Sequence, residues 1–267
     1  MGATMLLRAL LKRPTPSARN PVQATWLLGR IDLGHVRRYC AAFGFSGDAV
    51  PLTFLYLLAQ RAQLATMLEG DIPFRLPGLI HVDNTLTQHG PVLLARPLAI
   101  ATALHMQPPA PNGALHCVLE TRAHDGERLA FECASTYLVK RGSRRSGDKP
   151  AQQELPAGTA AGGWTLARDA GRRYAALSGD WNPIHLWPWT ARLMGMRAPI
   201  IHGAHTMAKA CAQLEQASGR RMESIACAFR SPAPLGAQVS LAAGPEAGQF
   251  AAICNGRVAV EGRARFA

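Results

Sequence analysis

The sequence lacks several features that would assign a chain to a class at once. No apolar run approaches the roughly 18–20 residues of a membrane-spanning helix, because the longest, 51–68, contains Gln60, Arg61 and Gln63. None of the six cysteines forms a CxxC pair, and no Cys/His cluster has zinc-ligand spacing. Charged residues make up only 17% of the 267 residues, too few for a disordered chain. We therefore expect a globular, cytoplasmic protein with reduced thiols, no membrane span and no metal.

Acidic residues are also scarce, and none occurs before Asp32. The formal net charge is +12 at pH 7, so the protein should attract anions. Its basic residues are spread out, without an aromatic-interleaved patch or a nucleic-acid-binding motif, so we expect no nucleic acid as a partner. A phosphate-bearing cofactor and an acidic carrier protein are the other candidates. The amphipathic segment 5–13 faintly resembles a transit peptide, but we interpret it as a helix lying on the domain.

A change in composition divides the chain into two unequal parts. Residues 141–163 are rich in Gly, Pro, Ser and charge, which predicts a linker between 1–140 and 164–267. Each part has a helical pattern, beginning at Leu52 or Gly203, followed by strand-like stretches, which predicts an α+β repeat. The expected strands are 79–86, 92–105, 114–122, 128–140, 224–230, 237–242, 249–254 and 257–266.

The segment 174–203 carries the residues that indicate chemistry. A helical pattern ends in the polar loop 178–183, where Gly and Asn-Pro break regular structure. Asp180 and His185 lie in or beside this loop, where side chains can converge. A carboxylate and an imidazole can together hold a water molecule and relay protons. Gly203, at the expected start of a helix, could present its N–H to a developing oxyanion and let a ligand approach closely.

These residues form a pattern that resembles a known family. The pattern Y-A-x-x-S-G-D-x-N-P-I-H (174–185), followed by P-I-x-H-G (199–203), is similar to that of the MaoC-like dehydratases and R-specific enoyl-CoA hydratases. The block Phe229–Pro232 with Gly236 resembles that family's next strand and turn. The resemblance therefore covers roughly residues 165–267, and 39–44 and 74–89 more weakly resemble the N-terminal repeat of single-chain members.

The resemblance implies a double hot-dog fold, in which each of two repeats is a long helix wrapped by an antiparallel β-sheet. It implies R-specific hydration of trans-2-enoyl thioesters, or dehydration of R-3-hydroxyacyl thioesters, in fatty-acyl metabolism. Asp180 and His185 would be the catalytic pair, and the Gly203 N–H would face the thioester oxygen. The implied substrate-binding residues are Asn182, Ser178, His202, Cys211 and Met207.

The resemblance implies no cofactor beyond the coenzyme A or phosphopantetheine that carries the substrate. The partner would be an acyl-CoA or acyl carrier protein thioester. Two hot-dog repeats in one chain would allow a monomer as well as a homodimer. In the first repeat Asp48 is present, but no histidine matches His185, so we expect one active site per chain and a first repeat that shapes the acyl channel.

Alternatives stay open for the residues and for the function. Ser178 could cap the loop, His202 could orient the turn, and Cys211 could be a buried core thiol. A hot-dog acyl-CoA thioesterase would deliver water to the carbonyl carbon instead, which the motif does not favour. A non-catalytic acyl-CoA-binding module is a third possibility, and the intact Asp180 and His185 pair argues against it.

Overall fold

The computed structural model describes residues 8–15, 20–46, 49–140, 142 and 158–267. The described strands join one sheet in the order β1-β3-β4-β5-β2-β7-β10-β9-β8-β6. All of the pairings in this sheet are antiparallel. The first half of this order, β1-β3-β4-β5-β2, corresponds strand for strand to the second half read in reverse, β6-β8-β9-β10-β7. The chain is therefore an internal repeat of one plan, and strands β2 and β7 form the junction between the repeats.

The two repeats contain equivalent elements. The first consists of β1 (Val22–Leu28), α2 (Leu33–Phe43), α3 (Leu52–Glu69), β2 (Ile80–Gln88), β3 (Leu98–Met106), β4 (Leu115–Asp125) and β5 (Arg128–Lys140). The second consists of β6 (Thr159–Thr165), α4 (Ala170–Ser178), the 3-10 turn η1 (Pro183–His185), α5 (Pro188–Leu193), α6 (Gly203–Ser218), β7 (Met222–Phe229), β8 (Gln238–Ala243), β9 (Gln249–Cys254) and β10 (Arg257–Phe266). A short helical turn also covers residues 8–11.

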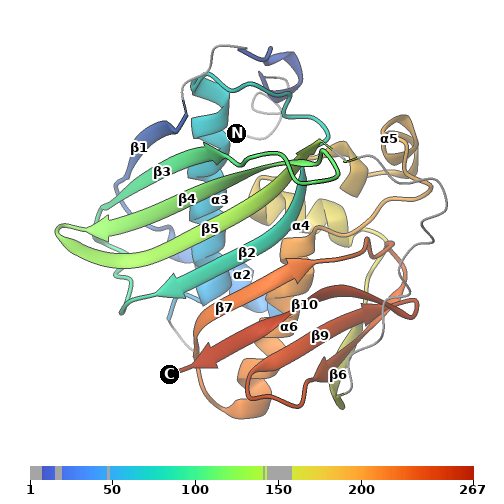
Figure 1. Ribbon diagram of the computed structural model, residues 1–267. Helices are drawn as coiled ribbons and strands as arrows, with labels where there is room; N and C mark the ends of the chain where they lie inside the picture. The colour runs from blue at the N-terminus through green and yellow to red at the C-terminus, as the bar shows by residue number, and fades with distance from the viewer. Residues whose placement is uncertain (1–7, 16–19, 47–48, 141, 143–157) are drawn as a thin grey trace.

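The sheet lies over two long helices, α3 and α6, which form the centre of the molecule (Figure 1). Most of the 18 residues of α3 are buried, on all sides of the helix. A helix that is apolar all round is stable only when it is enclosed. Helix α6 buries one face, which includes Ala204, Met207, Ala208 and Cys211. Both helices contribute to the same core cluster, so the two repeats share one hydrophobic core.

Several predicted elements are confirmed. Strands β5, β9 and β10 have the expected bounds, and helix α6 begins at Gly203 and ends before Gly219, whose φ is 65°. The turn between β9 and β10 is the expected hairpin, with φ of 50° at Asn255 and 69° at Gly256. Positive φ at both central residues is what a type I′ turn requires.

Other predictions were wrong in detail. The strand expected from Val92 begins at Leu98, and β6 begins at Thr159, inside the stretch expected to be a linker. Strand β1 was not predicted. Lys12 Nζ donates to the carbonyl oxygens of Leu68 at 3.0 Å and Gly70 at 2.8 Å, so this end of segment 5–13 lies against the end of α3.

Some expectations fall outside the described residues. Residues 1–7, 141 and 143–157 are among them, which includes most of the expected linker. The division of the chain into separate domains therefore stays a prediction. None of the described helices is long and apolar enough to cross a membrane.

Candidate active site

The loop that carries Asp180 is set by the end of helix α4. Gly179 ends the helix with φ of 83°, a left-handed conformation that favours glycine. Ser178 is buried, and its Oγ donates to the Tyr174 carbonyl oxygen at 2.9 Å and accepts from the Asp180 N–H at 3.1 Å. These are the contacts expected if Ser178 caps the loop rather than binding substrate. They fix where the Asp180 backbone leaves the helix.

Each oxygen of the Asp180 carboxylate accepts one hydrogen bond. Oδ1 accepts from the Asn182 N–H at 3.1 Å, and Oδ2 accepts from Gln60 Nε2 at 3.2 Å. The Asn182 side chain accepts from the Ile184 N–H at 3.4 Å and caps η1, so Asn182 supports the loop. Gln60 was not among the expected site residues. It lies on α3 of the first repeat, 120 positions before Asp180, and no motif in the sequence marks it.

His185 ends η1 and is buried. Its Nδ1 lies 2.8 Å from the Ile200 carbonyl oxygen, which can only accept a hydrogen bond. The neutral ring therefore carries its proton on Nδ1 and leaves Nε2 unprotonated. Burial lowers the pKa of His185, and the charge of Asp180 and the Ile200 hydrogen bond partly oppose that effect. At neutral pH the Nε2 atom can therefore accept a proton.

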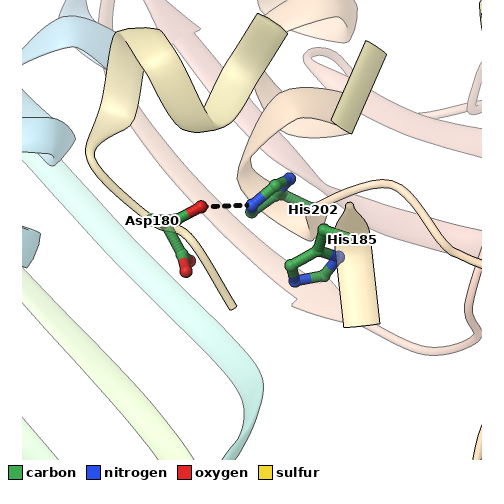
Figure 2. Close-up of side chains that lie close together, drawn as sticks. All are labelled: Asp180, His185 and His202. Carbon is green, nitrogen blue, oxygen red and sulfur yellow. Dashed lines mark hydrogen bonds between the residues drawn. The ribbon is translucent and has the colours of Figure 1, made fainter. Parts of the chain in front are cut away.

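His202 joins the two catalytic candidates. It is the N-cap of α6, and its ring stacks on that of His185 with centroids 3.6 Å apart and planes at 28°. Its Nε2 donates to the backbone oxygen of Asp180 at 3.0 Å (Figure 2). Burial, then the nearby His185, lower the pKa of His202 well below its usual value. These contacts fit the interpretation that His202 orients the turn.

Ligand atoms of Asp180, His185 and His202 all lie within 4.8 Å of one another. This spacing alone would also suit a metal ion. However, the lone pair of an imidazole lies in the plane of its ring, and the two rings are stacked nearly parallel. Stacked rings do not aim their lone pairs at one point, as a tetrahedral zinc site requires. The arrangement favours proton transfer over metal binding.

Gly203 is the first residue of α6. Among the described residues its N–H has no hydrogen-bond partner, as expected for the first turn of a helix. A Cβ at this position would lie 2.5 Å from Cδ1 of Phe229. The missing side chain therefore admits the Phe229 ring, a reason for the glycine that differs from the expected close approach of a ligand.

Cys211 and Met207 lie further along α6. Both are buried in the core, and the Met207 sulfur lies 3.5 Å from that of Cys227. Burial raises the pKa of Cys211 well above its usual value, so it is an unreactive core thiol. Contact of either side chain with substrate stays a prediction.

The chain is similar to known proteins over most of its length. Residues 149–253 match the family described as MaoC like domain. The chain is 34% identical over 195 residues to 3-hydroxyacyl-thioester dehydratase X of Mycobacterium tuberculosis, which covers 69% of this chain and 67% of the relative. The chain belongs to the MaoC-like dehydratase family.

Solved structures of MaoC-like proteins share the fold. The crystal structure of HtdX from Mycobacterium tuberculosis has a TM-score of 0.73 and 26% identity, covering 90% of this chain and 98% of that one. A MaoC-like dehydratase from Phytophthora capsici has a TM-score of 0.72 and 17% identity, covering 94% and 96%. A Mycobacterium tuberculosis protein described as a double hotdog has a TM-score of 0.59 and 14% identity, covering 93% and 96%. This MaoC-like protein therefore has the double hot-dog fold.

Proposed function

We propose that this MaoC-like protein interconverts trans-2-enoyl and R-3-hydroxyacyl thioesters by adding or removing water, using Asp180, His185 and Gly203. The observation that carries the proposal is the pairing of a carboxylate with a buried imidazole whose Nε2 is unprotonated. The name of the relative, 3-hydroxyacyl-thioester dehydratase X, supports the same reaction. The R configuration rests on the family resemblance.

In hydration, Asp180 and His185 Nε2 hold the water between them. As the water oxygen bonds to C3, one water proton passes to the pair, and the electrons of the C2–C3 bond move toward the thioester carbonyl. The Gly203 N–H, at the positive end of the α6 dipole, stabilises the enolate oxygen. The pair then returns a proton to C2. The product has gained one hydroxyl at C3 and one hydrogen at C2, and dehydration is the reverse.

The carrier of the acyl group would be coenzyme A or the phosphopantetheine of an acyl carrier protein. The net charge of +12 favours either of these anionic carriers. All six cysteines are free, which suits a reducing, cytoplasmic compartment. The two repeats pair within one chain, so a monomer as well as a homodimer would have a complete site. The fatty-acyl pathway that uses the reaction is part of this proposal.

The test is the loss of enoyl-thioester absorbance with crotonyl-CoA and a longer trans-2-enoyl-CoA. Asp180→Asn and His185→Ala should each lower kcat/KM by about 10²–10⁴-fold, because each removes a proton-transfer group. Asp169→Asn is the matched control. Asp169 is half-exposed and precedes α4, where it pairs with Arg173 at 2.8 Å, so the rate should not change.

Two results would contradict the proposal. One is a rate with Asp180→Asn or His185→Ala equal to that of the wild type. The other is release of free thiol from a saturated acyl-CoA without hydration of the enoyl substrates, which would favour the thioesterase. If neither coenzyme A substrate reacts, acyl carrier protein thioesters replace them. Binding of those thioesters without turnover would favour the acyl-CoA-binding module.

A further inference from the structure

We infer that Gln60, from the first repeat, is a positioning residue for the Asp180 carboxylate of the second. The inference rests on the proposed function, because it assumes that Asp180 acts on water. Gln60 Nε2 donates to Oδ2 at 3.2 Å, and the Asn182 N–H donates to Oδ1 at 3.1 Å. The carboxylate is thus held from both sides. Without Gln60 the carboxylate would be held at Oδ1 alone and could rotate more freely about its Cβ–Cγ bond.

The orientation of the Gln60 amide follows from its partner. If the amide were turned over, its carbonyl oxygen would face the carboxylate, and two acceptors would repel each other. With Nε2 toward Asp180, the Oε1 atom is shielded from solvent and has no partner among the described residues. A shielded, unpaired carbonyl destabilises the fold. A leucine would avoid that cost on a helix as apolar as α3, but it could not donate to Asp180, so the hydrogen bond to the carboxylate is the contribution that the amide makes.

The same helix offers a matched control in Gln63, which serves its own repeat. Its Nε2 donates to Thr121 Oγ1 at 3.2 Å and to the Leu119 carbonyl oxygen at 3.4 Å. These two partners lie on β4, and a third, Cys133 Sγ at 3.9 Å, lies on β5 of the same repeat. Gln63 is fully buried, its Oε1 likewise has no partner among the described residues, and none of its described hydrogen bonds reaches Asp180. The two glutamines therefore separate a contact that serves the site from one that serves the fold.

The first experiment compares Gln60→Leu with Gln63→Leu in the hydration assay. Gln60→Leu should lower kcat by about 10- to 100-fold, because a hydrogen bond to a charged group is lost. Its KM should stay close to that of the wild type, and its Tm should not fall, because Asp180 is only partly buried and water can replace the lost donor. Gln63→Leu should show the opposite pattern, with a lower Tm and an unchanged kcat in the folded protein.

A double-mutant cycle then tests whether Gln60 acts through Asp180. In the Asp180→Asn background, Gln60→Leu should cause almost no further loss of kcat, because the carboxylate that it orients is gone. A residue that only packed against substrate would cause the same loss in both backgrounds.

Gln60→Glu gives a second readout that packing would not produce. A carboxyl can donate to Asp180 only when it is protonated, and two neighbouring carboxylates share a proton more readily as the pH falls. The activity of Gln60→Glu relative to wild type should therefore rise as the pH is lowered, whereas that of Gln60→Leu should stay level.

The outcomes separate this inference from the proposed function. If Asp180→Asn keeps the wild-type rate, or the wild type does not hydrate enoyl thioesters, the proposed function fails and the inference fails with it. If Asp180→Asn is inactive but Gln60→Leu keeps kcat within about twofold of wild type, the inference alone is overturned. Equal losses from Gln60→Leu in the two backgrounds would also overturn it.

Discussion

The two repeats share a backbone plan but differ at the positions where chemistry would take place. Helices α2 and α4 both end at a glycine in the left-handed region, with φ of 87° at Gly44 and 83° at Gly179. In each repeat a buried tyrosine lies five positions before that glycine, Tyr39 or Tyr174. The next residue is Phe45 in the first repeat and Asp180 in the second. When the two helix ends are aligned, Phe45, rather than Asp48, is therefore the equivalent of Asp180. Residues 47–48 lie outside the described part of the chain.

The starts of the two central helices differ in the same way. Pro51 is the N-cap of α3, where His202 is the N-cap of α6. The first helical residue is Leu52 in one and Gly203 in the other. Between α2 and α3 the described residues form no counterpart of η1, which carries His185, or of α5. The first repeat therefore keeps the fold with apolar side chains at these positions, while the second has Asp180, His202 and the glycine N–H of Gly203 there.

The largest expected contrast lies at the first residues of the central helices. Gly203→Ala should lower kcat/KM by about 10²–10³-fold, because its Cβ would meet the Phe229 ring at 2.5 Å and displace the N–H. Leu52 is fully buried, so Leu52→Ala should cost about 2–5 kcal/mol of stability and leave kcat unchanged. Hydration kinetics and thermal unfolding measure the two effects. A lower kcat in Leu52→Ala, or an unchanged kcat/KM in Gly203→Ala, would contradict the view that only the start of α6 takes part in catalysis.

Acid should destabilise the protein through its buried histidines. Burial lowers the pKa of His81 in the first repeat and of His205 in the second to about 3. The unfolded chain binds these protons near pH 6.5, so stability is complete above that pH and is lost as the pH falls toward 3. Each such group contributes a slope of up to about 1.4 kcal/mol per pH unit.

His205→Leu tests this linkage in the second repeat. The His205 ring packs against Phe43 at 5.2 Å and Tyr174 at 5.7 Å, so a leucine keeps an apolar neighbour there. The variant should lose less stability than the wild type between pH 6.5 and 4 in denaturant titrations. If the free energy of unfolding falls equally with pH in the two proteins, protonation of His205 does not contribute to the loss of stability in acid.

The N-cap positions should give a smaller contrast. His202→Ala removes the hydrogen bond to the Asp180 backbone and the ring stacked on His185, so kcat should fall by about tenfold. Pro51→Ala at the equivalent position should leave kcat unchanged and cost less than about 1 kcal/mol of stability. Steady-state kinetics with circular dichroism melts would measure both. An unchanged kcat in His202→Ala would contradict the bridging role of His202.

The sequence predicted the parts of the molecule that depend on local pattern. The motif around Asp180 and His185, the start of α6 and the Asn255-Gly256 hairpin are all local signals. Strands β1 and β6 were missed, and both lie at the edges of the sheet. An edge strand is partly exposed and shows little hydrophobic pattern, and β6 also contains Gly162 and Gly163, which have low strand propensity.

The rest of the candidate site depends on contacts between distant parts of the chain. Gln60 on α3 of the first repeat reaches Asp180, which follows α4 of the second, only because the two repeats pack together. The stacking of His185 on His202 likewise needs the fold of the loop between them. A glutamine in an apolar helix carries no sequence signal of its partner when that partner is in the other repeat.

The smallest expected contrast lies at the two helix-ending glycines. Gly44→Ala and Gly179→Ala each place a side chain in the left-handed region and should cost about 1–2 kcal/mol of stability. The space is open at Gly179, where the nearest atom to a new Cβ is Arg61 Nε at 4.0 Å, and tighter at Gly44, where Gln216 Nε2 lies at 3.1 Å. On stability alone, Gly44→Ala should therefore be the slightly worse variant in thermal melts.

In activity, Gly179→Ala should instead be the worse variant, because only Gly179 precedes a catalytic candidate. A strained Gly179→Ala backbone would shift Asp180 relative to Gln60, and a small displacement of an oriented carboxylate lowers the rate. Gly44→Ala precedes Phe45 and should keep the wild-type kcat. Kinetics below the melting range of both variants measure this difference. Equal rates for the two would mean that the loop holds Asp180 through its side-chain contacts alone, and that the helix end common to both repeats adds only stability.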